Sequence, residues 1–91
     1  MNDPEQGAQT ANSGGDVSQI LDVSGESCPM PLLRTKLALN QLGAGEVLRV
    51  IATDPRSERD FETFCAQSGT ALLQAERKGD TFVYLLQKAA S

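Results

Sequence analysis

The sequence predicts a two-layer α/β sandwich in which a four-stranded mixed sheet carries two helices on one face. Strand-like and helix-like segments alternate in the order β-α-β-α-β-β. Single strands separated by helices need crossover connections on one side of a sheet. The last two strand-like runs are joined only by the glycine-containing turn 78–80, which predicts a hairpin.

Composition divides the chain into two parts. Residues 1–18 are rich in Gly, Ser, Asn, Gln, Asp and Pro, and such a segment has too little apolar surface to offset its ordering entropy. We therefore expect a disordered N-terminal tail over 1–18 and one folded domain over 19–91. The tail lacks the basic start and apolar stretch of a signal peptide, and no apolar run reaches the roughly 18 residues of a membrane span. A soluble cytoplasmic protein without membrane contact is the expectation.

The first strand and helix are predicted from residues 20–43. Ile20–Val23 alternates weakly as a strand, and Pro29 suits the first position of the helix that follows. Gly43 is placed to end that helix. The helix face expected to be buried combines two sets of positions at 3-and-4 spacing: Leu32, Thr35, Leu39 and Leu42, widened by Leu33 and Leu37.

The next strand is predicted over residues 47–51. Apolar side chains are dense enough there to predict a central strand buried on both faces. Asp54 and Pro55 then predict a helix start, as N-cap and first helical residue. Gly69 ends this helix. Its buried face is expected to hold Phe61, Phe64, Cys65 and Ser68.

The charge balance of the folded part limits its partners. Three of the twelve acidic residues lie in the tail, so residues 19–91 carry nine acids and eight bases, a net charge of 8 − 9 = −1. A direct nucleic-acid binder would show a basic face. The chain has no histidine and two cysteines, too few for a four-ligand zinc site. We expect no metal and no cofactor, and a protein or small-molecule partner.

The segment SGESCPMPLLRTK contains the most informative side chain. Cys28 follows a polar loop and precedes a proline, which favours an extended backbone and makes Cys28 the expected N-cap of the first helix. A helix N-terminus stabilises an anion by up to about 2 kcal/mol, which lowers the pKa of a thiol by up to roughly 1.5. The sequence therefore predicts an exposed, moderately reactive thiol.

Other roles for this cysteine are weighed against that interpretation. A lone cysteine before an apolar helix is often a small buried hydrophobe, and Cys65, on the phenylalanine face of the second helix, is expected to be one. Pro31 occupies the second cysteine position of a C-x-x-C motif, so a redox pair would require Cys65 to face Cys28. A cysteine-protease-like nucleophile lacks its histidine base.

The segment from about Leu21 to the end of the hairpin resembles the TusA (SirA-like) family of small sulfur-carrier proteins. Its most specific element is Cys28-Pro29-x-Pro31 after a strand and a glycine, and the second is DPRSERDFETFC, residues 54–65. Two departures bear on partner choice: the loop Glu26-Ser27 is less basic than in many members, and Thr70 stands where a histidine is common.

The resemblance implies that Cys28 accepts sulfane sulfur as a persulfide and passes it to the thiol of another protein. The donor would be a cysteine desulfurase or a rhodanese-like protein, and the acceptor a DsrE/TusD-like protein. The relay would serve tRNA 2-thiolation, molybdenum-cofactor sulfuration or sulfur oxidation, and we expect the carrier to be a monomer. A regulatory or interaction module, or a thiol redox sensor, on the same fold is the alternative.

The candidate site residues fall into three groups around the thiol. Cys28 is the expected sulfur-carrying residue. The residues expected to support its persulfide are Gly25, Ser27, Pro29, Met30 and Pro31. The residues expected to help dock a partner are Glu26, Arg59 and Asp60.

Overall fold

The computed structural model describes residues 17–89, and the predicted disordered tail therefore lies, but for its last two residues, outside the described residues. The six elements follow the predicted order. They are β1 (Gln19–Val23), α1 (Met30–Asn40), β2 (Val47–Ala52), α2 (Ser57–Ser68), β3 (Ala71–Lys78) and β4 (Thr81–Gln87).

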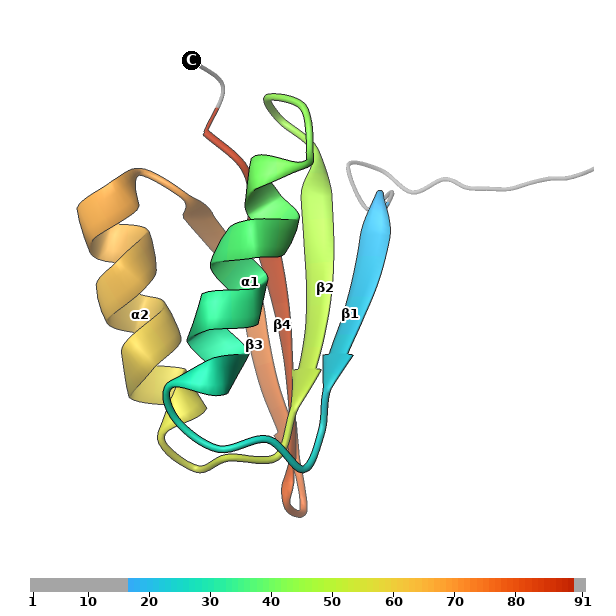
Figure 1. Ribbon diagram of the computed structural model, residues 1–91, viewed down its shortest axis with the longest axis vertical. Coiled ribbons are helices and arrows are strands. Elements are labelled where there is room, and N and C mark those ends of the chain that lie inside the picture. The colour runs from blue at the N-terminus through green and yellow to red at the C-terminus, as the bar shows by residue number, and fades with distance from the viewer. Residues whose placement is uncertain (1–16, 90–91) are drawn as a thin grey trace, which may run out of the picture.

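The four strands form one mixed sheet in the order β1-β2-β4-β3. β1 and β2 are parallel, whereas β4 runs antiparallel to both β2 and β3. Both helices lie on the same face of this sheet, side by side (Figure 1). The predicted two-layer α/β sandwich is confirmed.

The core lies between the helices and the covered face of the sheet. Alternate residues of β2 and β4 point into it, as the period of two along a strand requires. Phe61 of α2 and Tyr84 of β4 are its largest fully buried side chains, and their ring centroids lie 4.6 Å apart at an interplanar angle of 40°. This tilted contact joins the second helix to the middle of the sheet.

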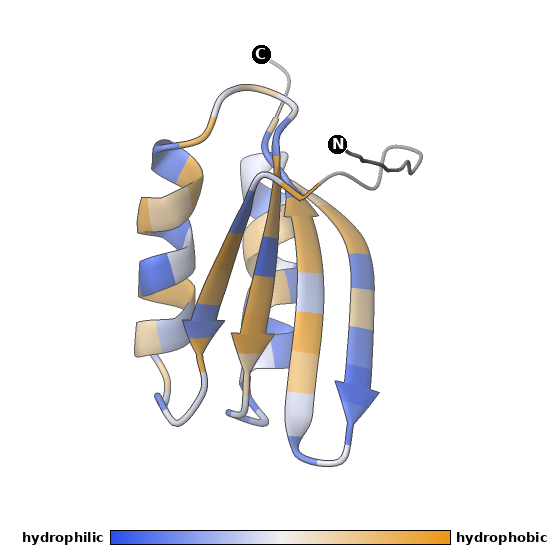
Figure 2. Ribbon diagram, turned by 90° about the vertical axis from the view of Figure 1, so that its right-hand side faces the viewer, coloured by the Kyte–Doolittle hydropathy of each residue, from blue (hydrophilic) through white to orange (hydrophobic). Residues whose placement is uncertain are grey.

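The other face of the sheet has no helix over it. Figure 2 shows the strands from this side. The edge strand β3, which leads into the hairpin turn, is hydrophilic in its second half. Arg49, in the middle of β2, is exposed on this face, opposite Ile20 of β1 and Leu85 of β4. The prediction of a twice-buried central strand is wrong, because the sheet is covered on one side only.

The first helix differs from its prediction in where it starts and which face it buries. It begins at Met30 with Pro29 as the N-cap residue, so Cys28, the expected N-cap, lies one residue before the observed cap. Leu33 and Leu37 are 48% and 61% exposed, and their predicted burial is wrong. The residues of the helix that are buried are Pro31, Thr35, Ala38 and Leu39.

The connection after α1 also differs from its prediction. The helix ends at Asn40, and the Gln41 N–H donates to the Ala38 carbonyl at 3.1 Å in a tighter last turn. Gly45, with φ of +83°, provides the left-handed residue of this loop, not Gly43. The Gly43 N–H instead donates to Glu46 Oε1 at 2.6 Å.

The second helix begins later than predicted, at Ser57. Asp54 still organises the start, because its Oδ1 accepts the Arg56 N–H at 3.0 Å and its carbonyl accepts the Ser57 N–H at 3.0 Å. Gly69 ends the helix in the left-handed conformation as predicted, with φ of +81°. Cys65 is buried as predicted, whereas Ser68 is exposed, which corrects that prediction.

Candidate functional site

Two loops meet at one edge of the sheet and form the candidate site. β1 and β2 are parallel and in register, with Val23 opposite Ala52, so the chain leaves both strands at the same edge. The loop after β1 carries Cys28, and the loop after β2 leads to α2. The Gly25 N–H donates to Thr53 Oγ1 at 2.8 Å across the two loops, and Gly25 has the left-handed φ of +83°.

The backbone of Cys28 is held by the second of these loops. Its N–H donates to Asp54 Oδ2 at 2.6 Å, while the other carboxylate oxygen accepts the Arg56 N–H. Asp54 is 7% exposed and its pKa lies below the usual range, chiefly because the Arg56 N–H stabilises the charged form and the Cys28 N–H adds to this. One buried carboxylate therefore fixes both the cysteine loop and the turn before α2.

The side chain of Cys28 is exposed and makes one polar contact among the described residues. Its Sγ–H donates to Asp60 Oδ2, with Sγ and Oδ2 3.4 Å apart. Asp60 is the fourth residue of α2 and is half-buried. Asp60, predicted as a docking residue, therefore lies directly beside the cysteine.

The electrostatics of the thiol differ from the prediction. The pKa of Cys28 is raised above its ordinary value, first by the hydrogen bond to Asp60, then by desolvation and by the charge of Asp60; Arg56 acts in the opposite direction. Two backbone N–H groups near the start of α1 are also engaged elsewhere, since the Cys28 N–H donates to Asp54 and the Met30 N–H donates to the Ser27 carbonyl at 2.9 Å. The predicted lowering of the thiol pKa is therefore wrong for the free protein.

The two prolines of the motif occupy different environments. Pro29 is exposed and follows Cys28 through a cis peptide bond. Pro31 is buried in the first turn of α1, and its carbonyl accepts the hydroxyl of the buried Thr35 at 2.8 Å. Ser27 and Met30 are exposed beside the cysteine, and Met30 is 43% exposed. Pro31 thus anchors the motif to the core while its other residues reach the surface.

The remaining predicted docking residues lie on two sides of the motif. Glu26 forms a salt bridge with Arg34 of α1, which ties the cysteine loop to that helix. Arg59 is exposed and lies next to Asp60. Arg59 and Asp60 line a surface hollow of about 370 Å³ together with Pro55 and Arg56.

Sequence reasoning missed the role of Asp54 and Thr53 in holding the cysteine loop. Asp54 was expected only to start a helix, and Thr53 had no expected role. The signal that could have found them is topological. Because two parallel neighbouring strands end at the same edge, the residues that directly follow them come together, whatever their separation in sequence.

The second cysteine and other possible centres lie elsewhere. Both thiols are free, and Cys65 is buried, which raises the pKa of its thiol. Within residues 17–89 there is no group of three or more Cys, Asp or Glu side chains that could hold a metal ion. In the same part of the chain, no helix has both the length and the apolar character needed to cross a membrane.

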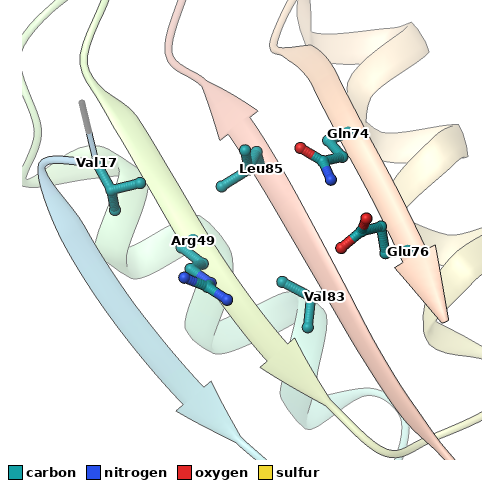
Figure 3. Close-up of a pocket in the computed structure, with 6 residues that line it drawn as sticks. All are labelled: Val17, Arg49, Gln74, Glu76, Val83 and Leu85. Atoms are coloured by element: carbon teal, nitrogen blue, oxygen red, sulfur yellow. The ribbon is translucent and has the colours of Figure 1, made fainter. Parts of the chain in front are cut away.

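A second hollow, of about 280 Å³, lies on the uncovered face of the sheet (Figure 3). Arg49 and Glu76 stand beside the apolar side chains of Val83 and Leu85 in this hollow. It contains neither cysteine and opens away from the helices. Its lining residues are Val17, Arg49, Gln74, Glu76, Val83 and Leu85.

The fold and the exposed thiol define a SirA-like α/β protein. The crystal structure of the SirA-like protein from Desulfitobacterium hafniense superposes with a TM-score of 0.64 and 26% sequence identity, covering 78% of this chain and 97% of that one. The chain belongs to the TusA family, since the family model described as sulfurtransferase TusA matches residues 19–88.

Relatives described as sulfur carrier proteins support the assignment. The sulfur carrier protein TusA of Allochromatium vinosum is 46% identical over 74 residues, which cover 81% of this chain and 97% of that protein. A putative sulfur carrier protein of Neisseria meningitidis is 47% identical over 70 residues, 77% of this chain and 95% of that protein. Membership of this family of sulfur carriers implies a sulfur-donating and a sulfur-accepting partner.

Proposed function

We propose that the protein is a sulfurtransferase that carries sulfane sulfur as a persulfide on Cys28 Sγ and passes it to an acceptor protein. The observation that supports this most directly is the exposed thiol of Cys28, on a loop fixed by Asp54, in a chain of the TusA family. A carrier must present its sulfur to two partners in turn. An exposed side chain on an ordered backbone meets that requirement.

The proposed loading step is a displacement at sulfur. The Cys28 thiolate attacks the outer sulfur of a persulfide on the donor, and a new S–S bond forms as that of the donor breaks. The donor cysteine leaves as a thiolate and takes up the proton that Cys28 has lost. The sulfane sulfur keeps its oxidation state, so no external oxidant or reductant is needed. Unloading is the same step with the carrier as donor.

The neighbouring residues have supporting roles in this proposal. Gly25 and Pro31 set the path of the loop, the first through its left-handed backbone and the second through its buried ring. Ser27, Pro29 and Met30 are the exposed surface beside the sulfur, against which a partner would pack. Glu26, Arg59 and Asp60 are the proposed docking residues around this surface.

The partners follow from the chemistry of the step. The donor is a protein that forms a persulfide, a cysteine desulfurase or a rhodanese-like protein, and the acceptor is a DsrE/TusD-like protein with a receiving thiol. The relay serves tRNA 2-thiolation, cofactor sulfuration or sulfur oxidation in the cytoplasm. The carrier acts as a monomer, without direct contact to nucleic acid or membrane.

Intact-mass measurement after loading tests the proposal. The protein is incubated with a cysteine desulfurase and cysteine, or with a rhodanese and thiosulfate. We expect the wild type to gain one sulfur atom that dithiothreitol removes, Cys28→Ser to gain none, and the matched control Cys65→Ala to load like the wild type. Absence of loading from both donors, or equal loading of Cys28→Ser, would overturn the proposal.

The same samples separate sulfur transfer from a dithiol switch. A Cys28–Cys65 disulfide would leave the monomer without a free thiol after mild oxidation, whereas a carrier with a buried Cys65 keeps that thiol. Thiol counting under denaturing conditions distinguishes the two. Loss of both thiols in the monomer would support the switch and count against a role of Cys28 as carrier alone.

A further inference from the structure

The contact between Cys28 and Asp60 joins the end of one loop to the second helix. Sγ and Oδ2 lie 3.4 Å apart, within the range of a thiol hydrogen bond to a carboxylate. Thirty-two residues separate the two in the sequence, so the contact depends on how α2 packs beside the cysteine loop. A carboxylate without a proton can only accept, so the thiol must be the donor.

The other charged groups around the sulfur leave Asp60 as its acceptor. Asp54 uses one carboxylate oxygen for the Cys28 N–H and the other for the Arg56 N–H. The first turn of α1 contains no acidic residue, and the charges that act on Cys28 come from Asp54, Arg56 and Asp60. Arg56 Nε lies 4.0 Å from Asp54 Oδ1, so Arg56 forms its salt bridge with Asp54 and not with Asp60.

We propose that Asp60 is a positioning residue that keeps Cys28 as a neutral thiol, with Sγ directed toward the start of α2, while the carrier is free. This inference rests on the proposed function and adds a control of reactivity to it. The negative charge of the carboxylate opposes formation of a thiolate beside it, and its oxygen stabilises the protonated form. The same effect raises the pKa of Cys28.

The hydrogen bond must break before sulfur transfer. The nucleophile is the thiolate, whereas a thiol that donates a hydrogen bond to Asp60 is protonated and turned toward α2. In the loading step the proton leaves Cys28 and reaches the departing thiolate of the donor. The free carrier therefore reacts slowly with small electrophiles and oxidants, and the complex with a donor, in which Asp60 is drawn away from the sulfur, reacts faster.

Alkylation kinetics test this inference without any sulfur donor. The rate at which iodoacetamide modifies Cys28 is measured from pH 6 to 10 by peptide mass mapping, which separates Cys28 from Cys65. We expect Asp60→Asn to react roughly three- to tenfold faster than the wild type near neutral pH, with its pH profile displaced to lower pH, since thiolate is the reacting form. The matched control is Glu76→Gln, which removes the same charge from the other face of the sheet.

Two further measurements keep the test specific. Asp60→Glu retains a carboxylate and should keep a profile nearer to the wild type than to Asp60→Asn. Thermal unfolding of each variant shows whether the fold is intact, and an Asn variant that is folded but reacts at the wild-type rate overturns the inference. An equal increase in the alkylation rate of Cys28 in Glu76→Gln would also overturn it. Because alkylation needs no persulfide, this result is independent of whether Cys28 proves to carry sulfur.

Discussion

The backbone N–H of Cys28 lies 2.6 Å from Oδ2 of Asp54, and this buried carboxylate also accepts the N–H of Arg56. The two loops that leave the parallel strands are therefore joined through one side chain.

Replacing Asp54 by alanine should destabilise the fold and loosen the cysteine loop. Two part-buried backbone N–H groups lose their acceptor, and the cost of about 1–3 kcal/mol for a fully buried unsatisfied donor sets the upper limit for each of them. Urea denaturation should show a lower midpoint with an unchanged m-value. The control is Glu62→Ala, which removes an exposed carboxylate from α2, the helix that follows Asp54, and should change the free energy of unfolding by less than about 0.5 kcal/mol.

The effect of Asp54→Ala can also be measured in the loop that carries Cys28. Once the N–H of Cys28 is free, the loop should exchange its backbone hydrogens faster, and hydrogen-exchange mass spectrometry of residues 24–29 measures this. Unchanged exchange in these residues, in a variant that is measurably less stable, would show that the loop is held by other contacts.

Acid should destabilise the protein through the same carboxylate. The pKa of Asp54 in the folded protein lies below the usual value, and that of Asp22 is also lowered, by hydrogen bonds from Ser24. A carboxyl whose pKa is depressed on folding contributes stability that is present above its unfolded pKa, about 3.9, and is lost as pH falls through the folded pKa. The melting temperature should therefore decrease as the pH is lowered below about 4.

A pH series of melting temperatures from 7 to 2 checks this, with Asp54→Asn beside the wild type. The Asn side chain does not titrate, so its curve should start lower at neutral pH and decline less in acid. Parallel curves for the two proteins would show that Asp54 contributes no pH-dependent stability.

The fold could be predicted from the sequence because its signals are local. Alternation, helical spacing and the glycines at 69 and 79 each act within a few residues, and the structure confirms the elements they predict. The buried face of α1 could not be predicted as well. Leucines lie on both sides of that helix, and packing against the sheet buries Thr35 and Ala38 while Leu37 stays exposed.

The exposure of Cys28 could be predicted from the sequence, but the direction in which the pKa of its thiol shifts could not. The motif around Cys28 indicates an exposed thiol, and the structure shows one. The direction of the pKa change depends on where Asp60 lies in space, which no local pattern contains. The hydrogen bond from the thiol to the Asp60 carboxylate is the largest cause of the raised pKa of Cys28.

The hydrogen bond between Ser57 and Tyr84 should be a measurable part of the free energy of unfolding. The two oxygens lie 2.8 Å apart and both side chains are buried, at 2% and 1% exposure, so the first residue of α2 is tied to the middle of β4. A buried neutral hydrogen bond contributes a net 0.5–1.5 kcal/mol or so, and a partner left without its bond costs about 1–3 kcal/mol.

A double-mutant cycle separates these two contributions. Ser57→Ala and Tyr84→Phe should each destabilise the protein, and the double variant should lose less than the sum of the two, since it leaves no hydroxyl unpaired. We expect a coupling energy of about 1 kcal/mol from urea denaturation of the four proteins. Because Asp60 follows Ser57 by less than one helical turn, both single variants should also alter the alkylation rate of Cys28 if the start of α2 shifts. Strict additivity of the two substitutions would instead mean that Ser57 and Tyr84 stabilise the fold independently.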